Sequence, residues 1–254
     1  MITIKSKSEL DIMREGGRIL ATTMREVSSA IRPGRTTPRE LDELALKTIR
    51  AHGAEPSFLG YRGFPAAACI SVNEVVVHGI PDDRTLQEGD IIGLDFGVFY
   101  KGFHTDSAWT FPVGQISREA QRLLNITRES LFQGIAQARE GNRVGDISQK
   151  IQKYVEGAGY SIVTDLVGHG IGKKLHEEPS VPNFGRAGRG ERLRNGMTIC
   201  IEPMVNAGRP EVVTLPDDWT LVTKDGTLSA HFEHTVAITP DGPVLLTADE
   251  ANPL

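Results

Sequence analysis

Cysteine is scarce in this chain of 254 residues, and its scarcity excludes several classes of protein. The two cysteines, Cys69 and Cys200, stand far apart, and neither belongs to a Cys-x-x-Cys pair. A disulfide framework and an all-thiolate zinc site both need several closely spaced cysteines, so neither is expected. Two free thiols favour a reducing compartment, and we therefore predict a cytoplasmic protein.

Long apolar runs and an excess of positive charge are also missing. Asp95 interrupts the longest candidate for a membrane span, and no apolar stretch follows Lys5 and Lys7, so we expect neither a membrane anchor nor a secretory signal. Basic residues number 28 and acidic residues 33, a net charge of −5. This balance argues against a general binder of nucleic acids or membrane surfaces, although it leaves local basic patches open.

Several common catalytic motifs are absent as well. The chain contains no Gly-x-x-x-x-Gly-Lys loop, no Gly-x-Ser-x-Gly elbow and no His-Glu-x-x-His pair. The segment Gly168-His-Gly-Ile-Gly lacks the spacing of a dinucleotide loop and has a bulky histidine where a phosphate would lie.

Local patterns predict two helices near the start of the chain. Ser6 and Glu9 form a capping box ahead of an amphipathic run that continues to Val27. A second helix begins at Thr37, which is followed by proline and then by a reciprocal glutamate, and ends at Gly53.

The pattern of helices followed by strands occurs twice. Strand-forming residues occupy positions 66–114, with a hairpin turn at Tyr100-Lys-Gly. Helical patterns return over about 117–140 and 146–156, and strand-like segments fill most of 161–247. Similar glycine-bounded helices at 32–54 and 139–158 suggest two pseudo-symmetric halves. Because no Pro/Ser-rich linker separates them, we predict one compact α+β domain over residues 1–254.

Five side chains that can bind a metal ion lie in the last two-thirds of the chain: Asp95, Asp106, His169, Glu202 and Glu233. Asp95 and Glu202 lie inside apolar segments, where a carboxylate is costly unless a cation or hydrogen bonds compensate it. For any one of them alone, a buried salt bridge or a turn carboxylate is the simpler interpretation. All five together favour two divalent cations, a centre that produces hydroxide near neutral pH and indicates a hydrolase.

The spacing of the ligands predicts how they meet. Asp95 and Asp106 are eleven residues apart with a turn between them, which is typical of neighbouring antiparallel strands. Asp106 or Glu233 can bridge two ions, whereas His169 can bind only one, so two inequivalent metal sites are expected. Oxygen ligands with one imidazole favour Mn, Fe, Co or Zn over copper.

Two histidines at turns leave two interpretations open. His78 precedes a glycine, and His176 lies seven residues after His169 in a segment that leads to a proline turn. For both, catalytic and structural roles are equally supported by the residues alone. The structural interpretation is preferred for the remaining histidines, His52, His104, His231 and His234.

Taken together, these segments resemble the type I methionine aminopeptidases of bacteria, which belong to peptidase family M24A. The resemblance covers nearly all of the chain and rests on an ordered series of motifs: Gly60-Tyr-Arg-Gly-Phe-Pro, Cys69-Ile-Ser-Val-Asn-Glu, Leu94-Asp-Phe-Gly, Gly168-His-Gly-Ile-Gly, His176-Glu-Glu-Pro, Ile201-Glu-Pro-Met-Val and Glu233-His-Thr. It implies the pita-bread (creatinase/aminopeptidase) fold, in which two related halves surround a dinuclear metal site.

The resemblance also implies an activity, the removal of the initiator methionine from nascent proteins and peptides whose second residue is small. It implies that Asp95, Asp106, His169, Glu202 and Glu233 bind the metals and that Asp106 and Glu233 bridge them. A metal-activated hydroxide would attack the methionine carbonyl, and Glu202 would relay its proton.

Further residues are assigned by the same resemblance. His176 would hydrogen-bond the scissile amide, and His78 would lie near the residue after methionine. A pocket with soft apolar walls would hold the methionine side chain, formed by Phe58, Tyr61, Phe64, Cys69, Leu175 and Trp219. Three positions match a site for a monovalent cation, Na or K, in relatives: Asn73, Val75 and Ser229.

The chain departs from many relatives only around the pocket. Phe58, Arg62, Phe64 and Leu175 replace a common cysteine, histidine, tyrosine and phenylalanine, respectively. None of these positions is an expected metal ligand, so the departures affect the shape of the pocket rather than the type of reaction.

Two rival interpretations are less favoured. A proline-specific peptidase of the same fold usually has an additional N-terminal domain, and a catalytically inactive relative usually lacks metal ligands, all five of which are present here. We therefore expect a monomeric enzyme that acts on nascent N-termini and associates transiently with the ribosome through its core surface. We expect no binding to membranes or to specific nucleic acids.

Overall fold

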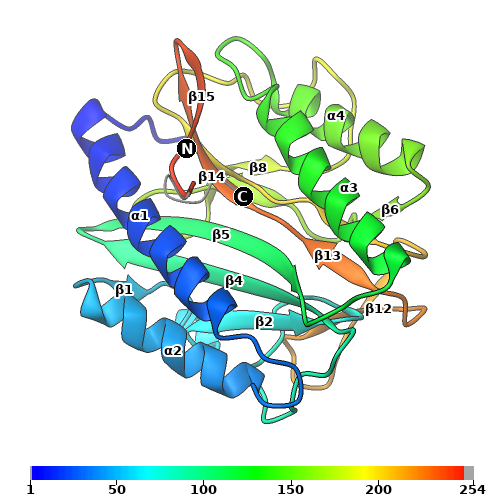
Figure 1. Cartoon of the computed structure of the whole chain (residues 1–254). Helices are drawn as coiled ribbons and strands as arrows, with labels where there is room; N and C mark the ends of the chain where they lie inside the picture. Colours follow the sequence, from blue (N-terminus) through cyan, green and yellow to red (C-terminus); the bar gives the residue numbers. More distant parts are fainter. Residues whose placement is uncertain (1, 249–254) are drawn as a thin grey trace.

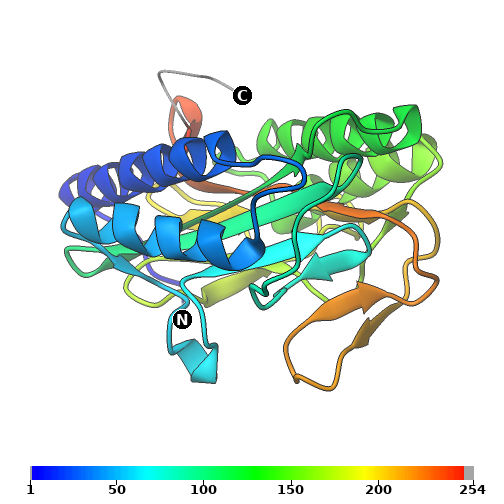
Figure 2. The same ribbon diagram turned by 60° about the horizontal axis from the view of Figure 1, so that its bottom comes forward.

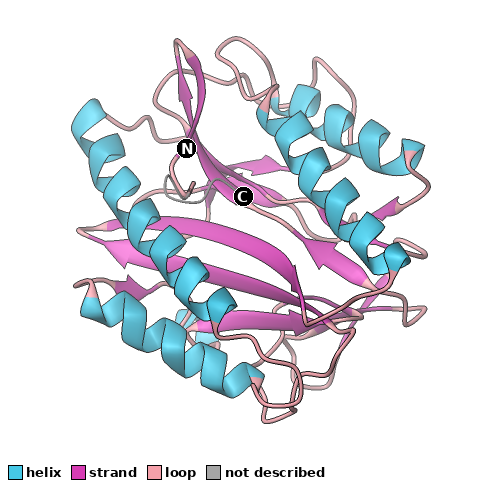
Figure 3. Cartoon of the chain, in the orientation of Figure 1, coloured by secondary structure: helices cyan, strands magenta, loops and turns pink. Residues whose placement is uncertain are grey.

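The computed structural model describes residues 2–248, and within them four α-helices lie on one side of the strands (Figures 1 and 2). The helices form two pairs, and the strands form the layer beneath them (Figure 3). The order helix, helix, strands occurs twice, as predicted. No helix in this described range is long and apolar enough to cross a membrane.

The first helix pair begins at the predicted caps. In α1 (Lys7–Ser29), the Ser6 hydroxyl accepts from the Glu9 N–H, and the Glu9 carboxylate accepts from the Ser6 N–H. A capping box of the same kind precedes α2 (Pro38–Ala51). These bonds satisfy N–H groups that have no partner within the helix.

The second helix pair consists of α3 (Arg118–Ile135) and α4 (Val144–Gly157). Helices α2 and α4 both have 14 residues, in agreement with the predicted repeat. α3 ends earlier than the expected position near residue 140. The N–H groups of Gln137 and Ala138 donate to carbonyls three residues back, which tightens the chain, and Gly141 then turns it with a φ of 92°.

A long hairpin organises the first half of the chain. Strands β4 (Ile91–Tyr100) and β5 (Phe103–Pro112) pair along their whole length. They are joined by the predicted turn, where Lys101 and Gly102 have positive φ angles of 46° and 87°. Two shorter strands pair with the other edge of β4, namely β1 (Glu55–Pro56) and β2 (Ala68–Val72).

The second half contributes a five-stranded antiparallel sheet in the order β15-β14-β9-β7-β8. Its strands are β7 (Gly168–Gly170), β8 (Glu177–Val181), β9 (Thr198–Ile201), β14 (His234–Thr239) and β15 (Gly242–Leu245). Two three-stranded sheets, β13-β10-β6 and β11-β12-β3, complete the layer. Their strands are β3 (Val75–Val77), β6 (Ser161–Ile162), β10 (Met204–Asn206), β11 (Val212–Thr214), β12 (Leu221–Thr223) and β13 (Ser229–His231).

The extent of strand predicted for residues 161–247 was too large. The strands there are two to six residues long. Glycine- and arginine-rich stretches such as 185–196 form loops instead, because Gly188, Gly190 and Gly196 adopt left-handed φ angles of 72°, 77° and 85°, which regular strand backbone does not have.

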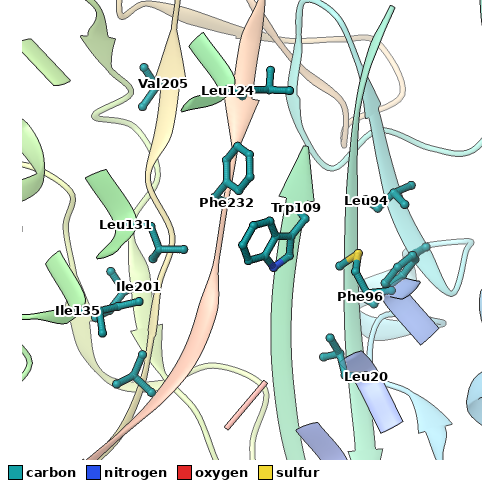
Figure 4. Close-up of a cluster of buried hydrophobic side chains, with 14 of the residues drawn as sticks. Leu20, Leu94, Phe96, Trp109, Leu124, Leu131, Ile135, Ile201, Val205 and Phe232 are labelled. Atoms are coloured by element: carbon teal, nitrogen blue, oxygen red, sulfur yellow. The ribbon is translucent and has the colours of Figure 1, made fainter. Parts of the chain in front are cut away.

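One apolar core joins the two halves. The same cluster of buried side chains includes Leu20 of α1 and Leu94 of β4 from the first half, and Ile201 of β9 from the second (Figure 4). Trp109 of β5 and Phe232 meet between them, with ring centroids 5.1 Å apart and planes at 79°. Because both halves contribute to one core, separating them would expose apolar surface.

The halves are also joined by hydrogen bonds between β5 and the start of β14, a set of contacts that we call the seam. Thr235 Oγ1 donates to the Asp106 carbonyl at 2.8 Å and accepts from the Asp106 N–H at 2.9 Å. The Glu233 N–H donates to the Ala108 carbonyl at 2.7 Å, and Ser107 Oγ donates to the Glu233 carbonyl at 2.7 Å. The seam therefore fixes the backbone positions of Asp106 and Glu233 relative to each other.

Gly17 allows α1 to lie directly on the segment that follows β15. A Cβ atom at this position would lie 1.8 Å from the carbonyl oxygen of Leu246, which is closer than any real contact. Gly157, at the end of α4, has no atom within 4 Å of the equivalent point.

We expect Gly17→Ala to lower the free energy of unfolding by about 2 kcal/mol or more, because α1 must move away from Leu246. Gly157→Ala is the matched control and should leave stability unchanged or raise it by about 0.5–1 kcal/mol, since a helical glycine gains rigidity without a clash. Urea unfolding followed by circular dichroism measures both. Equal stabilities of the two variants would contradict the close packing of α1.

Candidate metal centre

The hairpin of β4 and β5 places two carboxylates side by side. Asp95 lies opposite Ala108 in the ladder, and Asp106 lies opposite Gly97. The two aspartates are therefore diagonal neighbours on one face of the hairpin. Gly97 leaves room for Phe58, whose ring carbon Cε1 would lie 2.7 Å from a Cβ at that position. The predicted convergence of the two aspartates thus follows from the strand register.

Three segments of the second half bring further ligands to the same place. His169 lies in β7, Glu202 directly follows β9, and Glu233 lies between β13 and β14. His169 Nδ1 donates to the Gly170 carbonyl at 2.8 Å, so Nε2 keeps its free lone pair, 3.7 Å from Glu202 Oε1. Donor atoms of Asp106, His169 and Glu233 all lie within 4.8 Å of one another.

Several carboxylate oxygens in this cluster have no hydrogen-bond partner among residues 2–248. They are Oδ1 of Asp95, Oδ1 of Asp106 and Oε1 of Glu233, and all three are buried. A buried polar atom without a partner costs about 1–3 kcal/mol. A divalent cation would satisfy these oxygens together, so the residues present fit a metal centre.

The electrostatics of the cluster also favour a bound cation. Burial raises the pKa of Asp95 and the pKa of Glu202 to about 7. Burial, followed by the negative charge of neighbouring carboxylates, raises the pKa of Asp106 and of Glu233 well above the usual range. Four carboxylates in this space cannot all be charged at low cost unless positive charge lies among them.

Two residues at the centre were missed by the sequence analysis. Cys200 Sγ belongs to the same group of donor atoms within 4.8 Å. His231, which was interpreted as structural, is buried, and its Nε2 lies 3.6 Å from Glu202 Oε2 with no hydrogen-bond partner in the described chain. Strand alternation could have identified both, because Cys200 is two residues before Glu202 and His231 two before Glu233.

A cavity of about 320 Å³ adjoins these ligands and is lined by all eight residues expected to bind substrate: Phe58, Tyr61, Phe64, Cys69, His78, Leu175, His176 and Trp219. Trp219 meets Phe64 edge to face, with ring centroids 5.1 Å apart. Arg62 lines the cavity as well, as expected, and six further lining residues were not predicted there, namely Val77, Asp165, Leu166, Val167, Met204 and His231. Apolar walls beside a group of carboxylates suit a residue that has an apolar side chain and a free α-amino group.

The cavity favours a functional interpretation of His78 and His176. The Tyr61 hydroxyl lies 2.8 Å from His176 Nδ1, and the His176 ring lies 4.2 Å from that of His169. Burial is the main cause that lowers the pKa of His78 to about 4 and the pKa of His176 to about 3. Both rings are therefore neutral at pH 7, so each has one nitrogen that donates and one that accepts.

Other predicted positions lie outside this cavity. His104 Nδ1 contacts Ser57 Oγ at 2.9 Å, and His234 Nδ1 contacts Thr247 Oγ1 at 2.8 Å, in agreement with structural roles. Of the expected monovalent-cation residues (Asn73, Val75 and Ser229), the Ser229 N–H donates to the Asn73 carbonyl at 2.9 Å. The cation itself stays a prediction.

Comparison with known proteins agrees with this centre. The model of metallopeptidase family M24 matches residues 11–240. The match covers most of the chain, including all five expected ligands, and the chain therefore belongs to metallopeptidase family M24.

Within that family, the chain groups with the methionine aminopeptidases. It is 56% identical to the methionine aminopeptidase of Clostridium perfringens over 247 residues, which cover 97% of this chain and 99% of the relative. It is 52% identical to methionine aminopeptidase 1 of Bacillus subtilis, with the same coverage. The crystal structure of a methionine aminopeptidase from Thermotoga maritima superimposes with a TM-score of 0.96, at 44% identity over 98% of this chain and 100% of that chain.

The pita-bread fold is shared more widely. A prolidase from Pyrococcus furiosus superimposes with a TM-score of 0.76 at 23% identity, and the match covers 97% of this chain but 66% of the prolidase. This likeness shows the common fold alone. The predicted pita-bread fold is confirmed, and the whole-length relatives disfavour the proline-specific interpretation.

The raised carboxyl pKa values predict how stability depends on pH in metal-free protein. The folded-state pKa of Asp95 is about 7 and its ordinary value is 3.8, so its burial becomes destabilising as pH rises between these values. Asp95→Asn removes this ionisation. Relative to wild type, the variant should gain more than about 1 kcal/mol of unfolding free energy between pH 4.5 and pH 8. Urea unfolding in EDTA across this range measures the gain, and a pH-independent difference would contradict it.

Proposed function

We propose that this protein is a metal-dependent methionyl aminopeptidase that removes the initiator methionine from nascent proteins and peptides when the second residue is small. The observation that carries the proposal is the single cavity enclosed by apolar walls and by metal-binding side chains from both halves. Relatives that align over 97% of the chain are methionine aminopeptidases, which supports the same activity. We also propose that residues 1–254 form a single catalytic domain.

The proposed metal ligands are Asp95, Asp106, His169, Glu202 and Glu233. These residues would hold two divalent ions, and Asp106 and Glu233 would be shared between the two. Oxygen ligands with one imidazole fit Mn, Co, Fe or Zn. Such ions lower the pKa of a water molecule and polarise a carbonyl group. The seam supports this shared role, because its hydrogen bonds hold Asp106 and Glu233 at a fixed spacing.

Glu202 carries the proton in this proposal. It accepts a proton from the attacking water and delivers it to the departing amino group. Its Oε1 lies 3.7 Å from His169 Nε2 and its Oε2 lies 3.6 Å from His231 Nε2. The carboxyl group is therefore held between two imidazoles at the edge of the cluster, where one oxygen can turn to the substrate.

The cavity orients the substrate. The methionine side chain lies among the aromatic and apolar walls, and its α-amino group faces the carboxylates. The Tyr61 hydroxyl lies 2.8 Å from His176 Nδ1. In the tautomer with the hydrogen on Nε2, the hydroxyl donates to Nδ1 and Nε2 donates to the scissile amide. His78, which faces Trp219 at a centroid distance of 6.4 Å, borders the second residue and leaves room only for a small side chain.

Further properties belong to the same proposal. The protein acts as a cytoplasmic monomer on nascent N-termini, with transient association with the ribosome. A structural Na or K ion is bound by Asn73, Val75 and Ser229. The contact between Asn73 and Ser229 supports this third site, because it joins the two segments that carry its three residues.

The proposal predicts metal-dependent release of methionine. Metal-stripped protein should not cleave Met-Ala-Ser, and cleavage should appear after anaerobic addition of Mn²⁺, Co²⁺ or Fe²⁺. Met-Ile-Ser should stay intact, because its second residue is too large for the space beside His78. Chromatography of the released amino acids measures the cleavage of both peptides, Met-Ala-Ser and Met-Ile-Ser. Release of alanine from Ala-Pro peptides, with Met-Ala-Ser uncut under every metal, would refute the proposal.

The roles of His176 and Asp106 can be separated by measuring metal content together with turnover. His176→Ala should bind as much metal as wild type, while kcat falls by about 10²-fold or more, because a donor to the scissile amide is lost. Asp106→Ala is the comparison variant and should lose metal and activity together. Inductively coupled plasma mass spectrometry measures the metal content of each variant, and methionine release measures its turnover. Loss of metal from His176→Ala would make this histidine a ligand.

A further inference from the structure

The cavity has a positively charged side chain at its exposed end. Arg62 lines the cavity and is exposed, whereas Asp106 and Glu233 are only 4% and 2% exposed. Within residues 2–248, no carboxylate lies within 4.0 Å of the Arg62 guanidinium. The cavity therefore runs from a buried acidic end to an exposed end that carries a free guanidinium group.

The turn that carries Arg62, η1 (Tyr61–Gly63), is held in one conformation. Figure 2 shows this turn, in cyan, projecting from the face opposite the helices. Arg62 adopts φ 50° and ψ 24°, a left-handed conformation that residues with a side chain rarely adopt. The Tyr61 and Phe64 N–H groups donate to the carbonyls of Phe58 and Tyr61, both at 2.9 Å. Strained backbone of this kind concentrates at functional sites.

Contacts within the cavity show which part of a bound peptide Arg62 would meet. Its guanidinium carbon lies 5.4 Å from the centre of the Tyr61 ring, and the Tyr61 hydroxyl contacts His176. Burial, then His169, then the positive charge of Arg62 lower the pKa of His176, in agreement with this proximity. Arg62 is therefore next to the histidine assigned to the scissile amide, on the side where the peptide leaves the cavity.

We propose that Arg62 selects peptides with an acidic side chain at the third or fourth residue. This inference rests on the proposed function, in which the positively charged amino end faces the buried carboxylates. Residues beyond the scissile bond then pass Arg62, whose charge attracts aspartate or glutamate and repels lysine or arginine. Asp165 is an exposed acidic residue that also lines the cavity, and its opposite sign makes it a matched control.

The test uses amidated peptides Met-Ala-Xaa-Ser-Ser and Met-Ala-Ser-Xaa-Ser, with glutamate, glutamine or lysine as Xaa. Amidation removes the terminal carboxylate, which would otherwise supply a negative charge. In at least one series, kcat/KM should be about 2–5-fold higher for glutamate than for glutamine, the scale of an exposed ion pair, and lower again for lysine. The difference should appear in KM, because Arg62 does not touch the reacting atoms. It should shrink in about 0.5 M salt.

Variants assign the preference to one residue. Arg62→Gln, which removes the charge and keeps a long polar side chain, should bring the glutamate-to-glutamine ratio to about one. Arg62→Lys should retain most of the preference, and Asp165→Asn should retain or increase it. Two results would overturn this inference and leave the proposed function intact. One is an equal glutamate-to-glutamine ratio of kcat/KM in wild type and Arg62→Gln. The other is wild-type protein that cleaves the glutamine peptide and shows no preference for glutamate. Failure to cleave any peptide would overturn both.

Discussion

Repulsion among four carboxylates gathered in one small space is the constraint on which the rest of this structure depends. The seam holds Asp106 and Glu233 together through hydrogen bonds of the backbone and of Thr235, so these two side chains cannot separate by a local movement. Burial adds to the cost of their charge and raises the pKa values. The fold therefore holds an arrangement that is unfavourable until positive charge enters it, and this makes the site selective for cations.

Both halves of the chain contribute side chains to the site. The β4–β5 hairpin carries two of the proposed metal ligands through its register, and three separate segments of the second half carry the other three. The helix pairs lie on the opposite side of the strands from the η1 turn and the β11–β12 hairpin (Figure 2). The loop that connects β11 and β12 carries Trp219. These projecting segments supply cavity walls, while the shared core around Trp109 and Phe232 keeps the halves in place.

Features that depend on neighbouring residues could be predicted from the sequence, and features that depend on distant pairing could not. The capping box of Ser6, the turn at Lys101 and the apolar setting of Asp95 are local, and all agree with the structure. Strand alternation places Cys200 and His231 on the same faces as Glu202 and Glu233, but which face of each short strand meets the centre depends on pairing with distant segments. The wall formed by Asp165, Leu166 and Val167 comes from a loop without periodicity, so no pattern in the sequence points to it.

The distribution of the ligands along the chain determines when activity can arise during synthesis. Asp95 and Asp106 are made early, whereas Glu233 and Thr235 follow only after more than two hundred residues. A partial product that ends before Glu233 lacks the seam, one of the proposed metal ligands and the pairing of β14 with β9. Translation must therefore pass this point before the site described here can be complete.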